Sequence, residues 1–493
     1  MASKFEYSLS EICKQFTIDN LKPEQKEIIN ALVKKEDCIA ILPTGFGKSL
    51  PYQILVPFIR ELKKIASELE EGLQKQVKKH FDNQTIVVCC PLISLMQDQV
   101  ERLSAIPNLR VVFKGTDPAV NEQIKTGEIN IVFASPETLV GESDWRAQFQ
   151  TLKVDLIVVD EFHTIATWGG YENEDERAVF RKWFRHIGEL RSMFPSASLL
   201  ALSATCTIKI RKRVANVLDL REESTIMITK SPNRSNIKLV LSKTNNTIED
   251  GMYWLISGME TLRHAFPKTL IYANSISDVA KLYTYVVNEL PDCAEFVDMF
   301  HSETTEENKK TILNALRDNT STKRVVFATS ALGMGIDIGN CQSVVLYGPP
   351  HSVVDLVQEI GRVGRDGQSS VAIMLYNSYH LRNVNKDIKT LFKSETCRRQ
   401  VLMGNFLEEP QLTKLKAECN LHTCCDVCAK LCLCGKCEKL PVEKLLENIE
   451  CVETCSSSDS NTVNYSDLEA SDVNSDSFTS DCEEMLKACD DTN

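Results

Sequence analysis

A glycine-rich turn at residues 42–49, with the sequence Leu-Pro-Thr-Gly-Phe-Gly-Lys-Ser, is the stretch of the chain best suited to bind phosphate. It follows a short apolar run, residues 38–41, that we expect to form a buried strand, and it precedes a stretch that can begin a helix. Glycines let backbone N–H groups approach phosphate oxygens closely, and the N-terminus of a helix favours negative charge. Lys48 would then reach the β- and γ-phosphates while the Ser49 hydroxyl ligates Mg²⁺. The alternative is a glycine turn without a ligand, because Leu42 stands where the phosphate-binding pattern has its first glycine.

Two adjacent carboxylates supply a second part of a candidate nucleotide site. Asp160 and Glu161 directly follow residues 154–159, an apolar run that we expect to be a strand. The carboxyl end of a strand is where an open α/β sheet places its binding residues. There Asp160 can hold Mg²⁺, and Glu161 can orient and deprotonate a water molecule. Together with Lys48, the pair indicates an enzyme that hydrolyses a nucleoside triphosphate rather than a helix cap.

A third group of chemical interest lies much later in the chain, at residues 358–365 (Gln-Glu-Ile-Gly-Arg-Val-Gly-Arg). Arg362 and Arg365 are three residues apart, which is also the spacing of a solvated helix face. Beside glycines and opposite a phosphate-binding lobe, they favour a role as arginine fingers that clamp the phosphates of a nucleotide.

The elements that must position these groups follow one repeated pattern. Short apolar runs alternate with helical stretches, and the pattern restarts after residue 234. Such alternation implies parallel sheets covered by helices. We therefore predict an α/β protein of two similar lobes, split near residue 230, with a cleft between them. The expected strands are residues 38–41, 85–90, 130–134, 154–159, 198–202, 269–272, 325–328 and 344–347.

The charge of the chain is unevenly distributed. The net charge is −12, and residues 441–493 alone hold 14 acidic side chains against two lysines, so the preceding residues have no net charge. The acidic composition is therefore no argument against a nucleic-acid partner, which would need only a local basic patch. Neither a signal peptide nor an apolar run of ~18 residues is present, so we expect no membrane association. The nucleus would be the location in a eukaryote, and the cytoplasm otherwise.

In this order, the motifs closely resemble the RecQ family of superfamily-2 DNA helicases, over residues 16 to about 440. The resemblance implies two RecA-like lobes that bind ATP between them and move along single-stranded DNA, usually 3′ to 5′. The motifs are Pro23–Gln25, the turn at 42–49 continued through Tyr52 and Gln53, residues 91–99, Asp160–His163, Ser203–Thr205, residues 333–337 and residues 358–365.

The resemblance also implies a role for individual residues. Gln25 would read adenine, Glu161 would be the general base, and Arg365 would be the principal arginine finger, with Gln358 and Arg362 beside it. His163, Ser203 and Thr205 would couple hydrolysis to the DNA path. The implied nucleotide-binding residues are Gln25, Thr44, Gly45, Gly47, Lys48, Ser49, Asp160, Gly333 and Asp337. The implied DNA-binding residues are Ser94, Ser135 and Thr329, on strand-end loops, and Trp168, Phe180 and Arg181.

The sequence departs from the family in the carboxylate box, in the loop that follows it, and in lobe 2, where Ile276 stands where the family often has arginine. Phe162 replaces the usual alanine of the Asp-Glu-Ala-His box. The aromatic-rich loop that senses DNA has its two ends at Trp168 and Phe180, but an acidic insertion separates them. We expect this insertion either to weaken the coupling of DNA binding to hydrolysis or to fold outward as a surface loop.

Of the 19 cysteines, twelve lie between Cys397 and Cys489, which in a chain without a secretory signal favours metal over disulfides. A Cys-Arg-Arg run that begins at Cys397, together with a later CxxC pair, resembles the zinc-binding subdomain of the family. The alternative is reduced thiols without metal. The expected Zn²⁺ ligands are Cys397, Cys419, Cys425 and Cys428, with His422 or Cys424 as replacements for Cys419. Cys434 and Cys437, with Cys432 nearby, form an extra knuckle that can exchange ligands or hold a second ion.

The predicted domains are lobe 1 (1–229), lobe 2 (230–390), the zinc-binding subdomain (391–440) and a disordered acidic tail (441–493). We expect an ATP-dependent DNA helicase that acts on single-stranded DNA and tailed duplexes in repair or recombination, with ATP, Mg²⁺ and Zn²⁺ as cofactors. One alternative is a nucleic-acid-stimulated ATPase that remodels complexes without unwinding, because few residues remain for the winged helix that many relatives carry. Another is a catalytically weak scaffold whose zinc module and tail bind partner proteins.

Overall fold

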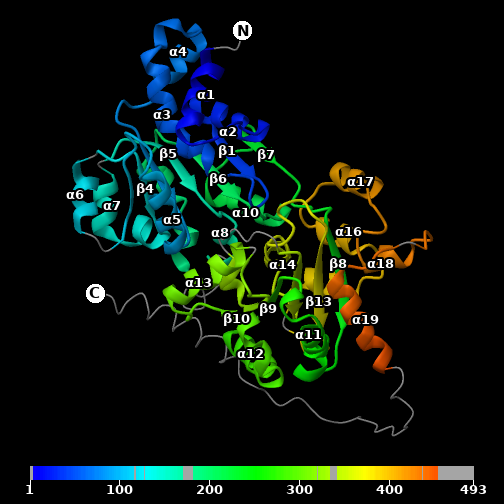
Figure 1. The fold of residues 1–493 in the computed structure, drawn as a ribbon. Helices are drawn as coiled ribbons and strands as arrows, with labels where there is room; N and C mark the ends of the chain where they lie inside the picture. The colour runs from blue at the N-terminus through cyan, green and yellow to red at the C-terminus, as the bar shows by residue number, and fades with distance from the viewer. Residues whose placement is uncertain are drawn as a thin grey trace, which may run out of the picture.

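The computed structural model describes residues 4–115, 118–126, 128–150, 152–169, 181–318, 320–333, 341–382, 384–435 and 437–453. Within these residues two parallel sheets, each flanked by helices, form two lobes that lie one above the other in Figure 1. Helices of the C-terminal part lie beside both lobes. The predicted fold class, two RecA-like α/β lobes followed by a small cysteine-bearing helical module, is confirmed. No helix in the described part of the chain is long and apolar enough to cross a membrane.

The sheet of lobe 1 is apolar on both faces because helices cover both. In β2, Ile86 and Val88 pack into one core while Val87 and Cys89 pack into another on the opposite face. Its strand order is β3-β4-β2-β5-β6-β1-β7, with every pair parallel. The strands are β1 (Asp37–Ile41), β2 (Thr85–Cys89), β3 (Val111–Phe113), β4 (Ile131–Ala134), β5 (Val154–Val159), β6 (Ser198–Ser203) and β7 (Thr225–Thr229).

The helices of lobe 1 connect these strands in chain order. Helix α3 begins directly after the glycine-rich turn and has Pro51 in its first turn, where a missing N–H costs no hydrogen bond. The helices are α1 (Lys4–Gln15), α2 (Pro23–Val33), α3 (Leu50–Lys64), α4 (Glu71–Val77), α5 (Ile93–Leu103), α6 (Pro118–Thr126), α7 (Ser143–Phe149), α8 (Thr164–Thr167), α9 (Glu189–Met193) and α10 (Ile208–Val217).

Lobe 2 has a parallel sheet with the order β10-β11-β9-β12-β13-β8. Four of its helices begin at a Ser or Thr whose side chain accepts a bond from a backbone N–H three residues later, which satisfies one orphan donor. The strands are β8 (Ile237–Lys243), β9 (Thr269–Ala273), β10 (Val297–Phe300), β11 (Val325–Ala328), β12 (Ser343–Tyr347) and β13 (Ser370–Tyr376). The helices are α11 (Ile248–Leu262), α12 (Ile276–Glu289), α13 (Glu306–Arg317) and α14 (Val353–Ile360).

The helical module that follows lobe 2 is held to it by backbone and arginine contacts. The backbone N–H of Leu239 in β8 donates to the carbonyl of Cys424 at 3.2 Å. Arg399 is buried and donates to the carbonyls of Cys424 and Arg234 and to the side chain of Asn233. The module's helices are α15 (Lys386–Lys393), α16 (Arg398–Met403), α17 (Glu409–Ala417) and α18 (Asp426–Lys430).

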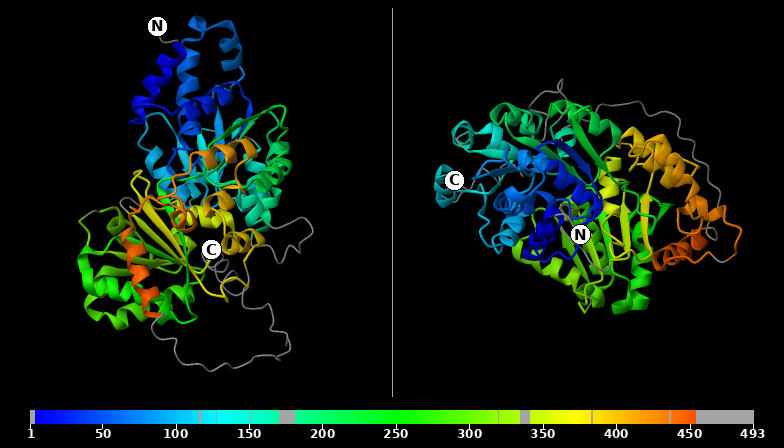
Figure 2. Two further views of the ribbon diagram at one scale, coloured as in Figure 1. Left: turned by 90° about the vertical axis from the view of Figure 1, so that its right-hand side faces the viewer. Right: turned by 90° about the horizontal axis from the view of Figure 1, so that it is seen from above.

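The prediction that the chain is disordered from residue 441 is wrong for its first part. Residues 441–453 form a further helix, α19 (Pro441–Glu453), which packs against α11 and β13 along the outer side of lobe 2 (Figure 2, left). Val442 and Leu446 are buried, and the Glu443 carboxylate lies 3.0 Å from the Lys238 ammonium in an almost fully buried ion pair. These contacts explain the helix despite the acidic composition. The rest of the predicted tail, residues 454–493, lies outside the described residues.

The ion pair yields a test of this packing. Glu443→Gln leaves the Lys238 charge buried without its partner, which we expect to cost about 3 kcal/mol of unfolding free energy. Glu447→Gln is the matched control, because Glu447 pairs with Lys439 at the half-exposed surface of the same helix. Thermal unfolding and hydrogen exchange of residues 441–447 measure both effects. Equal behaviour of the two variants would contradict the packing described for α19.

Candidate active site

The glycine-rich turn between β1 and α3 has the backbone that a phosphate cradle needs. Gly45 and Gly47 have φ angles of 78° and 81°, in the left-handed region that favours glycine. A side chain at Gly47 would also lie 2.7 Å from the Nε2 atom of Gln25. Both the conformation and the space therefore require glycine at position 47.

Gln25 is bound to this turn in the structure. Its Nε2 donates to the carbonyls of Phe46 at 3.1 Å and Gly47 at 3.0 Å, and its Oε1 accepts from the backbone N–H of Lys22 at 2.9 Å. Both hydrogens of the amide are thus in use, which leaves one lone pair of Oε1 for another partner. In this conformation Gln25 holds the phosphate turn in place, and its predicted contact with adenine stays a prediction.

The two carboxylates stand at the carboxyl end of β5, beside the same turn. The Lys48 ammonium lies 3.8 Å from Oε1 of Glu161. Glu161 has a φ of 47°, an unusual backbone for a residue with a side chain, and its N–H donates to the Asp160 carboxylate at 2.9 Å. The chain therefore changes direction sharply after β5. This brings Glu161 close to Lys48 of the glycine-rich turn.

These charges shift the two carboxyl groups in opposite directions. Removal from water, and then the neighbouring Glu161 charge, raise the pKa of Asp160 to about 6. Burial also works against the charge of Glu161, but Lys48, His163 and Arg362 outweigh it and lower the pKa of that carboxyl to about 2. A carboxylate whose charge is poorly compensated fits a divalent cation, so Asp160 and the Ser49 hydroxyl suit the predicted Mg²⁺.

A hydrogen-bond chain connects the carboxylates to lobe 2. Gln358 in α14 donates its amide to Nε2 of His163 at 3.0 Å and to the hydroxyl of Thr205 at 2.9 Å. Because Nε2 accepts, the ring hydrogen belongs on Nδ1, which lies 2.9 Å from the Ser203 hydroxyl and 3.3 Å from Oε2 of Glu161. The predicted coupling residues are thus brought together at the boundary of the lobes. Phe162, which replaces the family's alanine, is fully buried in the lobe 1 core.

Arg362 and Arg365 follow α14 on the lobe 2 side of this boundary. Arg362 is 4% exposed, and burial is the main cause that lowers its pKa. The carbonyl of Gly364, between the two arginines, accepts bonds from the side chains of Arg234 and Asn236. These bonds fix the turn that carries both arginines.

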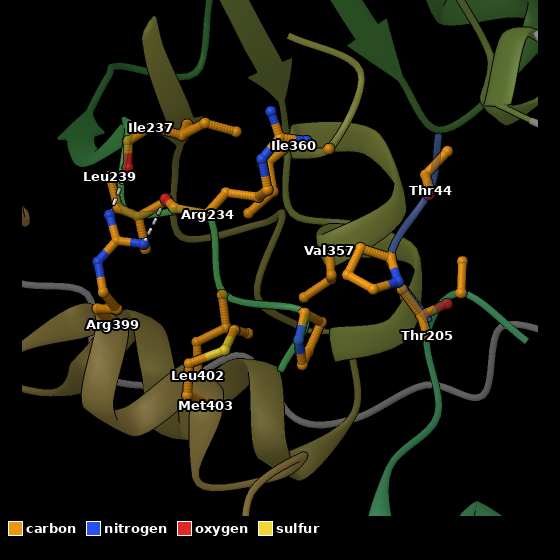
Figure 3. Close-up of a pocket in the computed structure, with 14 residues that line it drawn as sticks. Thr44, Thr205, Arg234, Ile237, Leu239, Val357, Ile360, Arg399, Leu402 and Met403 are labelled. Carbon is orange, nitrogen blue, oxygen red and sulfur yellow. Dashed lines mark hydrogen bonds between the residues drawn. The ribbon is translucent and has the colours of Figure 1, made fainter. Parts of the chain in front are cut away.

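Arg234 and Arg399 line a pocket that the sequence did not indicate. Figure 3 shows Thr44 and Thr205 of lobe 1 on one side of it, near Val357, and Arg234 and Arg399 on the other. Dashed lines in the figure mark bonds of the Arg399 guanidinium to the carbonyls of Arg234, in the segment that joins the lobes, and of Ile237, at the start of β8. The one sequence feature that could have indicated this pocket is Arg399, the second arginine of the Cys-Arg-Arg run. A buried arginine needs several acceptors, so it must lie where several segments meet.

The predicted DNA-binding residues differ in how exposed they are and in whether the structure describes them. Ser94 is exposed in the first turn of α5, Ser135 bonds Thr138 after β4, and Thr329 is mostly buried after β11. All three follow carboxyl ends of strands, at the sheet edges that carry the candidate nucleotide site. Phe180 and Asp337 lie outside the described residues, as does the acidic insertion, and Gly333 ends the short 3₁₀ helix Ser330–Gly333 at the limit of a described segment.

Arg181, predicted to bind DNA, has its guanidinium bonded to other groups of the protein in this structure. Its guanidinium pairs with both oxygens of Glu137 and donates to the carbonyl of Pro91, and it stacks 4.7 Å from the Phe184 ring and 5.6 Å from the Trp168 ring. These contacts join the loops that follow β2, β4 and β5. In this structure Arg181 positions those loops.

Four thiols in the helical module form a candidate zinc centre. The sulfur atoms all lie within 4.8 Å of one another, and Sγ of Cys397 is 3.4 Å from Sγ of Cys424. The backbone N–H of Cys428 points to Sγ of Cys425 at 3.5 Å, a bond that stabilises thiolate charge. Four such sulfur atoms fit a structural tetrahedral Zn²⁺. The four are Cys397, Cys424, Cys425 and Cys428.

In the structure Cys424, one of the two replacements considered, is grouped with the other three cysteines in place of the preferred Cys419. Cys424 is buried next to Cys425, and its carbonyl is fixed by Leu239 and Arg399. Cys419 follows the end of α17, is only half-buried, and is not among the four. Tertiary contacts, which spacing does not record, select the ligand.

Metal analysis distinguishes the two cysteines. We expect Cys424→Ser to lose one Zn²⁺ per chain and to lower the thermal midpoint, because a closed site contributes folding free energy. Cys419→Ser is the control and should retain the zinc content of the unaltered protein. The reverse result, with zinc lost from the Cys419 variant alone, would restore the original ligand set.

Two family models match the chain in order. Residues 22–214 match the DEAD/DEAH box helicase model, and residues 253–367 match the helicase conserved C-terminal domain model. The first match covers the phosphate turn and the paired carboxylates, and the second ends just after the arginine pair.

Curated relatives match over most of this chain. The bifunctional 3′-5′ exonuclease/ATP-dependent helicase WRN of Mus musculus is 28% identical over 440 residues, which is 84% of this chain and 28% of the relative. The ATP-dependent DNA helicase RecQ of Haemophilus influenzae is 27% identical, over 85% of this chain and 63% of the relative. A putative ATP-dependent RNA helicase of Acanthamoeba polyphaga mimivirus is 28% identical, over 84% and 70%. The chain thus spans less than two thirds of the length of the first two.

Solved structures share the fold at lower identity. The helicase MrfA bound to DNA and AMPPNP has a TM-score of 0.58 at 19% identity, over 85% of this chain and 60% of that one. Dbp5 of Saccharomyces cerevisiae bound to RNA and ADP BeF3 has a TM-score of 0.55 at 16% identity, over 80% and 94%. The chain therefore has both helicase domains in order, and over most of its length it is similar to helicases of the RecQ type.

Proposed function

We propose that this protein is an ATP-dependent DNA helicase that couples hydrolysis to movement along single-stranded DNA, in the 3′ to 5′ direction, and to duplex unwinding. The observation that carries the proposal is the bond of Gln358 in lobe 2 to His163 and Thr205 in lobe 1, immediately beside Glu161. A group that spans the lobes at the hydrolytic carboxylate can transmit the state of the nucleotide to the whole of lobe 2. A role in DNA repair or recombination rests on the family resemblance.

In the proposed reaction Lys48 binds the β- and γ-phosphates and Glu161 orients a water molecule and accepts its proton. Without nucleotide, Lys48 holds the pKa of Glu161 near 2, which makes the carboxylate a weak base. When Lys48 turns to the phosphates, that pKa rises and Glu161 becomes a stronger base. Mg²⁺, held by Ser49 and Asp160, supplies charge neutralisation for the phosphates.

Arg365 and Arg362 stabilise the charge that develops on the transferred phosphoryl group. They belong to lobe 2, so they reach the reaction only when the lobes are together, and the turn that carries them is braced by Arg234 and Asn236. DNA bound across the strand-end loops after β2, β4 and β11 would favour the same closed arrangement. Hydrolysis would then respond to DNA.

The test of function is strand displacement on a duplex with a 3′ single-stranded tail. We expect unwinding with ATP but not with a non-hydrolysable analogue, and little unwinding of a 5′-tailed duplex. Lys48→Ala should reduce ATP turnover by about 10²-fold or more while DNA affinity changes little, because the lysine contacts only phosphates. Lys64→Ala, an exposed lysine of α3, is the control. DNA-stimulated turnover without strand displacement would support the remodelling ATPase instead, and normal turnover in Lys48→Ala would refute the nucleotide site.

Arg365→Ala separates catalysis from binding. An arginine finger acts mainly on the charge of the transition state, so we expect a loss of turnover on the order of 10³-fold with nucleotide affinity retained. Arg221→Ala is the matched control, since Arg221 is exposed and precedes the amino end of β7, whereas the site lies at the carboxyl ends of these parallel strands. Steady-state ATPase rates and binding of a fluorescent nucleotide give both quantities. Weak binding with intact turnover would contradict the finger role.

A further inference from the structure

A second group of metal-binding side chains lies beside the four-cysteine centre and shares no residue with it. The ligand atoms of His422, Cys432, Cys434 and Cys437 all lie within 4.8 Å of one another. His422 precedes α18 and the three cysteines follow it, so side chains from both flanks of the helix meet. This convergence is not explained by the first centre, whose four positions are already filled.

The distances fit one tetrahedral ion. Nδ1 of His422 is 3.4 Å from Sγ of Cys434, 3.3 Å from Sγ of Cys437 and 3.8 Å from Sγ of Cys432. Sγ of Cys434 is 3.6 Å from Sγ of Cys437. With Zn–S bonds of about 2.3 Å, two sulfur ligands of a tetrahedral zinc are about 3.8 Å apart, and a nitrogen and a sulfur slightly less. A disulfide needs about 2.05 Å, so the pair of Cys434 and Cys437 has metal-ligand rather than disulfide geometry.

Burial of apolar surface does not account for the conformation of this loop. Leu421, Leu431 and Leu433, which flank the cluster, are 40%, 66% and 99% exposed. Cys434 is itself exposed, and Gly435 has a φ of 64°, which lets the chain reverse between Cys434 and Cys437. A loop without a core needs another source of free energy to bring four soft ligands together, and a structural metal supplies it.

We propose that His422, Cys432, Cys434 and Cys437 bind a second structural Zn²⁺ through three thiolates and Nδ1 of the imidazole. Thiolate and imidazole ligands without an open position select Zn²⁺ over harder cations such as Mg²⁺. The two ions then brace α18 from both sides: one holds Cys424, Cys425 and Cys428, and the other joins the residues before and after the helix. The second ion thereby fixes the path from α18 toward α19, which packs on lobe 2.

Zinc content of the full chain, purified under reducing conditions, tests the proposal. We expect about two Zn²⁺ per chain in the unaltered protein, and one in the double variant Cys434→Ser/Cys437→Ser. Cys419→Ser, a half-buried cysteine outside both groups, is the matched control and should keep two. A single ion in the unaltered protein, or an unchanged content in the double variant, would overturn the proposal.

Two further variants show whether His422 is a ligand. His422→Ala should lose one ion, and His422→Cys should retain two, because a fourth thiolate also completes a tetrahedral site. ATP turnover should change less than about twofold in both, since the cluster takes no part in the proposed reaction. Equal zinc content in His422→Ala and His422→Cys would exclude the imidazole from the site. A disulfide between Cys434 and Cys437 found by mass spectrometry of the reduced preparation would exclude the ion.

Discussion

The contact on which the rest of the structure depends is the bond of one amide, that of Gln358, to His163 and Thr205. It is where two independently packed lobes meet at the carboxyl ends of their strands. His163 in turn lies within 3.3 Å of Glu161, and Glu161 within 3.8 Å of Lys48. A displacement of lobe 2 therefore changes the electrostatics of a carboxylate in lobe 1. In the proposed function this short chain of polar groups would link a nucleotide in one lobe to movement of the other.

The helical module contributes to this contact from a distance. Arg399 binds the segment between the lobes, the start of β8 and the carbonyl of Cys424 at once. Its guanidinium is buried, so each lost acceptor would leave an unsatisfied donor. Cys424 belongs to the candidate zinc centre, its carbonyl accepts a bond from Arg399, and Arg399 also donates to the segment between the lobes. The module is thus part of the helicase core rather than an appendage, and a second ion at His422 would extend the same bracing toward α19.

The sequence was informative where one short segment determines its own structure. Apolar runs predicted the central strands, and the glycine-rich sequence predicted a turn between a strand and a helix. Properties that depend on contacts between distant segments could not be predicted from the sequence. Gln25 and Arg181 were assigned to ligands, but acceptors within the protein hold their donors. Cys419 and Cys424 are equally plausible by spacing, and only the neighbours of Cys424 decide between them. The helix at 441–453 was hidden by acidic composition, because the partner that pairs with Glu443 is Lys238, some two hundred positions earlier.

The charges at the strand ends affect the two neighbouring carboxyl groups differently. Lys48 neutralises Glu161, and Asp160 is left as the carboxyl group whose charge the surroundings oppose. Moving Lys48 to the phosphates leaves two neighbouring carboxylates without their cation, a state that favours the binding of another positive charge. Nucleotide and divalent cation should therefore bind with positive linkage. In the proposed function the lysine would therefore have a second effect besides binding phosphate, because its charge lowers the pKa of Glu161 while the two groups are close together.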